Sequence, residues 1–504
     1  MDFMKDLEKN EKAITDNGAI GYKTSGSYLL DLNFSVPKFR NAIDSKLFDK
    51  ALAEDRLLTL KWLLYLRDIK CGLGERKSFR DFLVYLCYKY EDLGSSFIDC
   101  VDIEEYGRWD DYIYLYFNTI NRRVKETIAS YLAYTLRNDL LACSEGRPVS
   151  LLAKWLPSEN ASSKKTRARA KYLRKHVFKL SAKDYRKSLS ALRKHCASVE
   201  VLTSSNKWDE IDYSAVPSKA NIKYASAFLR HDYERRIDYL DELSEGKTKI
   251  NCDSMFLYDI VHKYKFATEE EEATLEALWE NQKPIELTGD VLVVRDGSGS
   301  MFSFVSGSVS ASDICDSICL YCAEHNSGAF KNKFITFSSK PRVVDLTNFK
   351  TLGDKLGELS SYDDWTNTDL DRTFKLILDT AVKNGYKQED MPKTILIVSD
   401  MQFDSGCNNI PLMEEIANNF AMYGYKLPKL VFWNVSAGNM VVPIQQNENG
   451  VILVSGFSKN LVDMVVSSDI DPYKALVNVL NSDRYNIEGL DLTEIKKCDI
   501  ITVQ

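Results

Sequence analysis

The chain has 504 residues and a formal net charge of −7, from 66 Lys and Arg against 73 Asp and Glu. Its hydrophobic content of 44% and charged content of 28% are typical of a folded globular protein and exclude a disordered chain, and its length is sufficient for about two to four domains. The acidic total argues against a surface that binds nucleic acid throughout, but it is compatible with a local basic patch.

The amino-terminal residues alternate in charge and lack the apolar stretch of a secretion signal. No uncharged apolar run reaches the roughly 18 residues of a membrane-spanning helix. The 11 cysteines are odd in number and scattered, which indicates free thiols rather than a disulfide framework. We therefore expect a cytoplasmic protein that does not enter a membrane.

The first half of the chain is predicted to be helical. Between about residues 47 and 279, apolar residues recur at spacings of three and four, which is the period of an amphipathic α-helix. Short runs rich in Val and Ile are nearly missing from this part. We predict an all-α, HEAT-like helical-repeat domain over residues 1–285, built from packed helical hairpins.

After Pro284 the pattern changes to short β-branched runs separated by helix-length stretches. This alternation predicts a mostly parallel sheet covered on both faces, in a Rossmann-like domain over residues 286–504. The run at 341–346 follows the run at 333–339 too closely for a helical crossover, so we expect an antiparallel hairpin at the sheet edge. The predicted fold class is α + α/β. The expected helices are 310–326, 368–385, 410–424 and 458–466.

Oxygen-bearing side chains follow two of the predicted strands. The first strand runs into Asp296, Ser298 and Ser300, which alternate with glycines, and a later strand ends directly before Asp400. In an open parallel sheet, ligands bind beyond the carboxyl ends of the strands. One or two carboxylates with hydroxyls are suitable ligands for Mg²⁺ or another divalent cation such as Mn²⁺. The sequence therefore predicts a divalent-cation site at this edge.

Between these two strand ends, the loop at 364–369 adds two threonines, Thr366 and Thr368, followed by Asp369. The combined set resembles the metal-ion-dependent adhesion site (MIDAS) of a von Willebrand factor A domain, and it consists of Asp296, Ser298, Ser300, Thr368 and Asp400. In many members of that family the threonine precedes the residue that opens a helix, so the resemblance favours Thr368 over Thr366. The alternative is a turn rich in glycine and serine that caps a helix without metal.

Four segments of the helical half resemble an uncharacterised family that pairs a helical domain with a C-terminal von Willebrand A domain. They are residues 63–83, 102–115, 150–163 and 207–220. More distantly, this architecture is similar to the Ro autoantigen, or TROVE, proteins, whose helical repeats form a ring closed by such a domain and bind noncoding RNA. The resemblance implies, by analogy of architecture, a ribonucleoprotein role.

Positive charge is concentrated between Lys154 and Lys194. This stretch of 41 residues holds nine Lys and five Arg against only Glu159 and Asp184, so its charge is +12 and the rest of the chain carries −19. We predict RNA binding by Lys164, Lys165, Arg167, Arg169, Lys171, Arg174 and Lys175. A solvated or internally paired face and an acidic protein partner are the alternatives. The interleaved aromatics, which are Tyr172, Phe178 and Tyr185, either stack on unpaired bases or pack in the core.

We expect a binding protein and not an enzyme, because no histidine accompanies a nucleophile in a recognisable signature and no carboxylate pair is placed for acid–base chemistry. The leading hypothesis is a non-catalytic protein that binds noncoding or single-stranded RNA and holds Mg²⁺ at a ligand site. The first alternative is a Mg²⁺-dependent scaffold that captures an acidic group of a protein partner without RNA. A metal-dependent phosphoesterase is the third hypothesis.

Overall fold

The computed structural model describes residues 12–14, 20–196, 199–252, 255–284, 287, 291–337, 340–363, 369–403, 412–436, 451–458, 461 and 471–490. The chain folds into two compact units. Unit 1 combines Met1–Trp62, Lys70–Leu73 and Cys252–Tyr485, and unit 2 combines Leu63–Ile69, Gly74–Asn251 and Asn486–Gln504.

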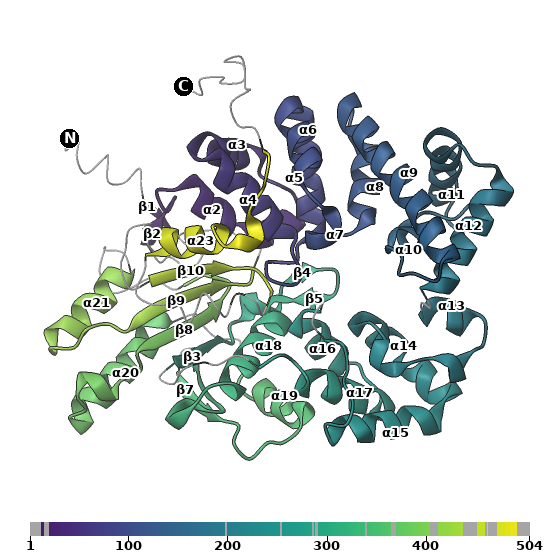
Figure 1. The fold of residues 1–504 in the computed structure, drawn as a ribbon. Coiled ribbons are helices and arrows are strands. Elements are labelled where there is room, and N and C mark those ends of the chain that lie inside the picture. Colours follow the sequence, from purple (N-terminus) through teal and green to yellow (C-terminus); the bar gives the residue numbers. More distant parts are fainter. Residues whose placement is uncertain are drawn as a thin grey trace. The chain divides into compact units, whose positions relative to one another are not determined.

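Unit 2 is helical throughout its described part (Figure 1). Its helices are α5 (Arg76–Lys89), α6 (Glu91–Cys100), α7 (Ile103–Tyr106), α8 (Trp109–Asn118), α9 (Arg122–Ser144), α10 (Leu152–Trp155), α11 (Lys164–Tyr172), the π-helix η2 (Leu173–Phe178), α12 (Ala182–His195), α13 (Val199–Ser204), the 3₁₀ turns η3 (Trp208–Glu210) and η4 (Tyr213–Ala215), α14 (Ser218–His231) and α15 (Tyr233–Ser244). Consecutive helices pack against each other as hairpins, for example α5 on α6 and α14 on α15.

Local side chains set the limits of the helices that carry the basic stretch. Ser163 caps α11 by accepting the N–H of Thr166, and Ser181 caps α12 by accepting the N–H of Asp184. Between them, Lys179 adopts a left-handed conformation with φ of 53°, which ends η2. The basic stretch therefore folds as two capped helices joined by a tight turn.

A six-stranded sheet forms the centre of unit 1, in the order β10-β9-β8-β3-β6-β7 (Figure 1). The strands are β3 (Val291–Asp296), β6 (Lys333–Phe337), β7 (Arg342–Asp345), β8 (Thr394–Ser399), β9 (Lys429–Asn434) and β10 (Val451–Ser455). All neighbours run parallel except β6 and β7, which form the antiparallel edge hairpin that the short connection predicts. Every residue of β3 is buried, as expected of a strand covered on both faces.

Unit 1 also contains two small hairpins and a set of helices. The hairpins are β1 (Lys12–Ile14) with β2 (Ile20–Tyr22), and β4 (Phe304–Ser306) with β5 (Val309–Ser310). The helices are α2 (Tyr28–Phe34), α3 (Ser45–Glu54), α16 (Leu257–Tyr264), α17 (Glu269–Glu280), α18 (Ala311–Glu324), α19 (Leu352–Ser360), α20 (Leu370–Asn384), α21 (Leu412–Met422) and α23 (Pro472–Leu480), while α4 (Arg56–Arg67) crosses the division between the units. The short 3₁₀ turns are η1 (Val36–Arg40), η5 (Gly299–Phe302), η6 (Gly328–Phe330), η7 (Gln388–Asp390) and η9 (Asp483–Tyr485).

The predicted class, a helical amino-terminal part followed by a mostly parallel sheet with helices, is confirmed. Three of the four expected helices correspond to α18, α20 and α21, and most of the fourth, at 458–466, lies outside the described residues. None of the helices in the described ranges is both long and apolar enough to cross a membrane.

The compact units divide the chain differently from the expected division into residues 1–285 and 286–504. Helix α2 belongs to unit 1 and packs on β10 and α23. The backbone carbonyl of Phe34 accepts hydrogen bonds from Asn434 Nδ2 at 3.2 Å and from Ser455 Oγ at 2.8 Å. The amino-terminal helix therefore satisfies polar groups at the carboxyl ends of β9 and β10, and this long-range pairing leaves no mark in the local sequence pattern.

Candidate metal centre and basic surface

The strand order places the predicted cation ligands at one position of the sheet. Strand β3 ends at Asp296 and the neighbouring strand β8 ends at Ser399, directly before Asp400. The chain leaves β3 toward β6 on one side and returns to β8 on the other side. This is the topological switch point, where open parallel sheets commonly bind their ligands.

Hydrogen bonds hold the loop after β3 in a tight conformation. Asp296 Oδ1 accepts the backbone N–H of Ser298 at 2.9 Å, and Asp296 Oδ2 accepts the hydroxyl of Ser399 at 2.6 Å. The hydroxyls of Ser298 and Ser300 lie 3.0 Å apart, and Asp400 Oδ1 accepts the N–H of Gln402 at 3.1 Å. One carboxylate and two hydroxyls therefore lie together at the end of β3.

The two aspartates at this edge are buried and repel each other. Burial raises the pKa of Asp296 to about 7, and the nearby carboxylate of Asp400 contributes to the increase, against hydrogen bonds from Ser399 and Ser298 that lower it. A divalent cation would offset both effects, because its charge balances the two carboxylates. Carboxylates with serine hydroxyls are the oxygen donors that Mg²⁺ accepts, so these residues fit the ion.

Of the five predicted ligands, Thr368 lies outside the described residues, as does the alternative Thr366. Asp369, which follows, caps α20 by accepting the N–H of Arg372 at 3.0 Å, so the expectation that it opens this helix is confirmed. Within the described ranges, no group of three or more His, Cys, Asp and Glu side chains is arranged to hold a metal. Binding of a cation at this edge would therefore need the serine hydroxyl groups as ligands in addition to the carboxylates.

A buried ion-pair network beside this loop was missed by sequence reasoning. The side chain of Arg295 is 1% exposed, and its Nη2 lies 2.7 Å from Asp316 Oδ1 on α18 and 2.6 Å from Asp363 Oδ1. Burial by itself lowers the pKa of Arg295, but the two carboxylates outweigh it and raise that pKa. Arg295 therefore ties Asp363, which directly precedes residues 364–368 in the sequence, to the strand that carries Asp296.

Gly297 packs closely against the same Arg295 side chain. A Cβ atom at Gly297 would lie 3.3 Å from Arg295 Nη1 and 3.3 Å from the carbonyl oxygen of Tyr362, which is closer than most such contacts. The sequence gives one signal of this buried ion-pair network, which is Arg295 itself, a charged residue that interrupts the apolar run of a fully buried strand.

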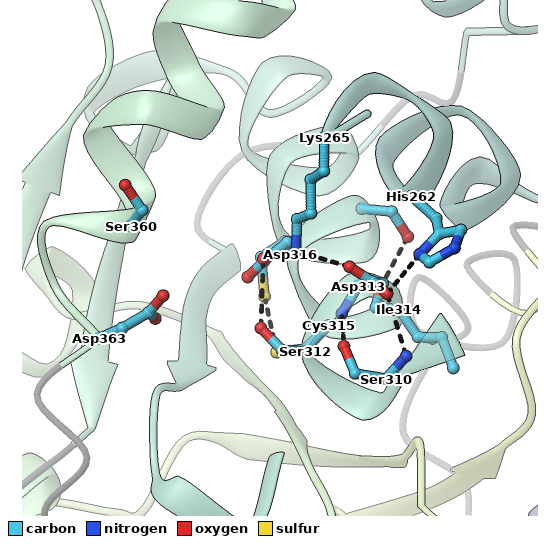
Figure 2. Close-up of polar contacts among 12 residues, drawn as sticks. His262, Lys265, Ser310, Ser312, Asp313, Ile314, Cys315, Asp316, Ser360 and Asp363 are labelled. Atoms are coloured by element: carbon cyan, nitrogen blue, oxygen red, sulfur yellow. Dashed lines mark hydrogen bonds and ion pairs between the residues drawn. The ribbon is translucent and has the colours of Figure 1, made fainter. Parts of the chain in front are cut away.

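Lys265, next to α16, links this network to Asp313 of α18, because its Nζ lies 3.8 Å from Asp316 Oδ2. The Asp313 carboxylate accepts hydrogen bonds from Lys265 Nζ at 2.5 Å and from the N–H of Ser310 at 3.0 Å, and it lies 2.9 Å from His262 Nδ1 (Figure 2). Burial alone would raise the pKa of Asp313, but these contacts outweigh it and lower that pKa. The helices α16 and α18 are thus joined by charge as well as by apolar packing.

The Asp313→Asn variant is expected to be less stable than the wild type at neutral pH, with a difference that shrinks in acid. Because the folded-state pKa is lowered, the carboxylate contributes its full stability above the unfolded-state pKa of about 4, and this contribution is lost as the pH falls through the folded-state pKa. Thermal midpoints measured between pH 7 and pH 3 test this. A difference that stays constant over the range would contradict it.

In unit 2, the lysines and arginines of the basic stretch have different roles. All five arginines contact other parts of the protein. Arg167, Arg186 and Arg193 donate hydrogen bonds, to the carbonyls of Ala161 and Ser162, to the carbonyl of Ala182, and to the carbonyls of Ala153 and Leu156 and the hydroxyl of Ser158, respectively. Arg174 pairs with Glu159 at 2.8 Å, and Arg169 lies over the Phe117 ring. Eight lysines are exposed and have no charged or hydrogen-bonding partner among the described residues: Lys164, Lys165, Lys171, Lys175, Lys179, Lys183, Lys187 and Lys194. We call these eight residues the lysine surface.

The alternative of an internally paired face therefore applies to the arginines and to Lys154, which lies 3.9 Å from Glu200, but not to the lysine surface. Of the seven residues predicted to bind RNA, Lys164, Lys165, Lys171 and Lys175 are free for a ligand within the described structure. The other three, Arg167, Arg169 and Arg174, hold the local structure together.

The three interleaved aromatic side chains differ in how far they are buried. Tyr185 is fully buried and its hydroxyl donates to the carbonyl of Pro157 at 2.9 Å. Phe178 is half-buried and stacks on Tyr185, with ring centroids 5.8 Å apart. Tyr172 is 46% exposed. Core packing thus accounts for Tyr185 and Phe178, and it leaves the ring of Tyr172 at the surface.

Comparison with known proteins gives two matches to families of unknown function. Residues 159–287 match a domain of unknown function (DUF2828) and residues 290–488 match another (DUF7788). The lysine surface lies in the first match, and Asp296 and Asp400 lie in the second. The first match ends at residue 287 and the second begins at residue 290.

Two individual proteins are similar to the chain. Uncharacterized protein L728 of Acanthamoeba polyphaga mimivirus is 28% identical over 527 residues, which covers 96% of this chain and 90% of that protein. The crystal structure of the Deinococcus radiodurans Ro (RSR) protein is 13% identical and covers 89% of this chain and 93% of that chain, with a TM-score of 0.38.

Proposed function

We propose that this chain is a non-catalytic RNA-binding protein that contacts RNA phosphates through the lysine surface of unit 2. The observation that carries the proposal is the separation of roles within the basic stretch. The arginines and both acidic residues are engaged within the protein, and eight exposed ammonium groups remain without a partner in the described structure.

The chemistry of lysine suits this role. An exposed ammonium group on a flexible stem contacts phosphate as a point charge, without demanding a particular geometry or base. Eight such groups within 31 residues, from Lys164 to Lys194, form a dense positive field, while the rest of the chain is acidic. When these groups neutralise the phosphates of a nucleic acid, the cations condensed on that polyanion are released, which favours binding at low salt.

A salt titration tests this proposal. Binding of a fluorescently labelled single-stranded RNA by the purified full chain is measured by anisotropy between about 50 and 300 mM salt. Each engaged phosphate contributes about −0.7 to the slope of log K against log salt, so eight lysines set a limit near −6. Absence of binding at the lowest salt, or a slope near zero, would exclude the proposal.

The second function that we propose is a Mg²⁺-dependent ligand site at Asp296, Ser298, Ser300, Thr368 and Asp400, in a von Willebrand A-like domain. It is favoured by the position of Asp296 and Asp400 at the topological switch point and by the raised pKa of Asp296. Bound Mg²⁺ would leave a coordination position for an oxygen ligand, such as a carboxylate of a protein partner.

Mg²⁺ or Mn²⁺ is expected to raise the thermal midpoint of the wild-type protein, because a ligand that binds only the folded state stabilises it by about 2.7 kcal/mol at 100 times its Kd. Ser300→Ala is expected to reduce this shift, since the exposed hydroxyl can be removed with little effect on packing. Ser303→Ala, an exposed serine on the same segment, is the matched control. Equal metal responses of the two variants, or none in the wild type, would count against the site.

A further inference from the structure

The basic stretch that carries the lysine surface also contains an exposed aromatic ring. Tyr172 is the last residue of α11, and its ring is 46% exposed. It is held from within by Phe117 and Tyr116 of α8, with ring centroids at 5.9 and 6.2 Å, and it contacts the ring of His176 at 4.5 Å. The ring is thus anchored in one place while much of its surface remains in water.

Several cationic residues lie near Tyr172 along the same basic stretch. Lys165 and Arg169 precede Tyr172 by seven and three residues, which places all three on the same face of α11. The Arg169 guanidinium lies over the Phe117 ring, 4.9 Å from its centroid. Lys171 and Lys175 belong to the lysine surface on either side in sequence. A rigid aromatic face beside several cations matches a nucleotide, which combines a flat base with a phosphate.

We propose that Tyr172 is a stacking platform for an unpaired nucleobase, and therefore that the lysine surface takes single-stranded RNA in preference to a duplex. This inference rests on the proposed RNA-binding function and makes it more specific. In an A-form duplex the base faces are covered by their neighbours, so a duplex can offer only phosphates to this surface. A single strand offers phosphates to the lysines and a free base face to Tyr172.

Variants of Tyr172 separate the stacking contribution from the charge contribution. Tyr172→Ala is expected to weaken binding of a 12-nucleotide oligouridine by about 5-fold to 100-fold, the range for loss of one stacking aromatic. Binding of a 12-base-pair RNA duplex and the salt slope are expected to stay unchanged, because no phosphate contact is removed. Tyr172→Phe, which keeps the ring, is expected to bind like the wild type.

The matched control is Tyr233→Ala, because Tyr233 is an exposed tyrosine of the same unit at the start of α15, outside the basic stretch. A strand that contains 2-aminopurine gives a direct readout, because stacking on Tyr172 quenches its fluorescence and Tyr172→Ala is expected to restore it. If Tyr172→Ala leaves oligouridine binding unchanged, or weakens duplex and single strand equally, the stacking platform is excluded while the lysine surface stands. If the wild type binds neither RNA, both proposals fail.

Discussion

Replacing Lys164, Lys165, Lys171 and Lys175 together by glutamine is expected to weaken binding of single-stranded RNA on the order of 100-fold at 0.15 M salt. The reason is electrostatic, because these four side chains are exposed and have no partner in the described structure. Removing four phosphate contacts is also expected to reduce the salt slope by about 3. Anisotropy titrations of the variant and the wild type across salt concentrations measure both effects.

The matched control is a second quadruple variant, in which four lysines that are paired with carboxylates are replaced and the net charge changes by the same amount. Lys77, Lys207, Lys247 and Lys387 are exposed, but each lies close to a carboxylate. Their replacement by glutamine is expected to leave the salt slope unchanged. If both quadruple variants bind RNA equally, the lysine surface is not the binding site, whatever the affinity of the wild type.

Arg295→Met is expected to destabilise unit 1 by about 3–5 kcal/mol, because it leaves two carboxylates in a buried position without their main cation. The side chains of Asp316 and Asp363 are only 6% and 16% exposed. For a unit of this size, the loss corresponds to a decrease of the thermal midpoint on the order of 10 °C. Circular dichroism melts of the full chain measure the decrease.

Lys333→Met is the control in the same sheet, because the Lys333–Asp345 pair is exposed at the edge and is expected to contribute little. A second comparison replaces Arg295, Asp316 and Asp363 together by Met, Leu and Asn. This triple variant is expected to recover much of the lost stability, since removing a whole buried network costs far less than removing one partner. An Arg295→Met protein as stable as the wild type would show that the network contributes nothing to stability.

The expected loss of RNA binding and the expected loss of stability both follow from a chemical difference between lysine and arginine. Arginine has a planar fork of donors that several backbone carbonyls or carboxylates can satisfy at once, so the fold uses Arg193 and Arg295 internally. Lysine has a compact, strongly hydrated charge that is cheaper to leave in water. A count of positive residues therefore overestimates the charge that a ligand meets, and the lysines alone give the better estimate.

The sequence by itself determined the features that depend on neighbours along the chain. The strands β3 and β8, the antiparallel edge of the sheet and the start of α20 at Asp369 follow from apolar runs, connection length and capping chemistry. The position of Asp296 and Asp400 at one edge of the sheet also follows, because the carboxyl ends of parallel strands always lie on the same side. The clustering of charge into one stretch is likewise a property of the sequence.

Only the tertiary structure decided which side chains meet across long separations. The pairing of Arg295 with Asp363 joins residues 68 positions apart, and the contact of Phe34 with Ser455 spans 421 positions. The periodicity of apolar residues tells which face of an element is buried, but it does not identify what covers that face. For the same reason Tyr172 and Tyr185 looked alike in the sequence. Only the packing left Tyr172 46% exposed beside Tyr116 of α8 and buried Tyr185 against Phe178.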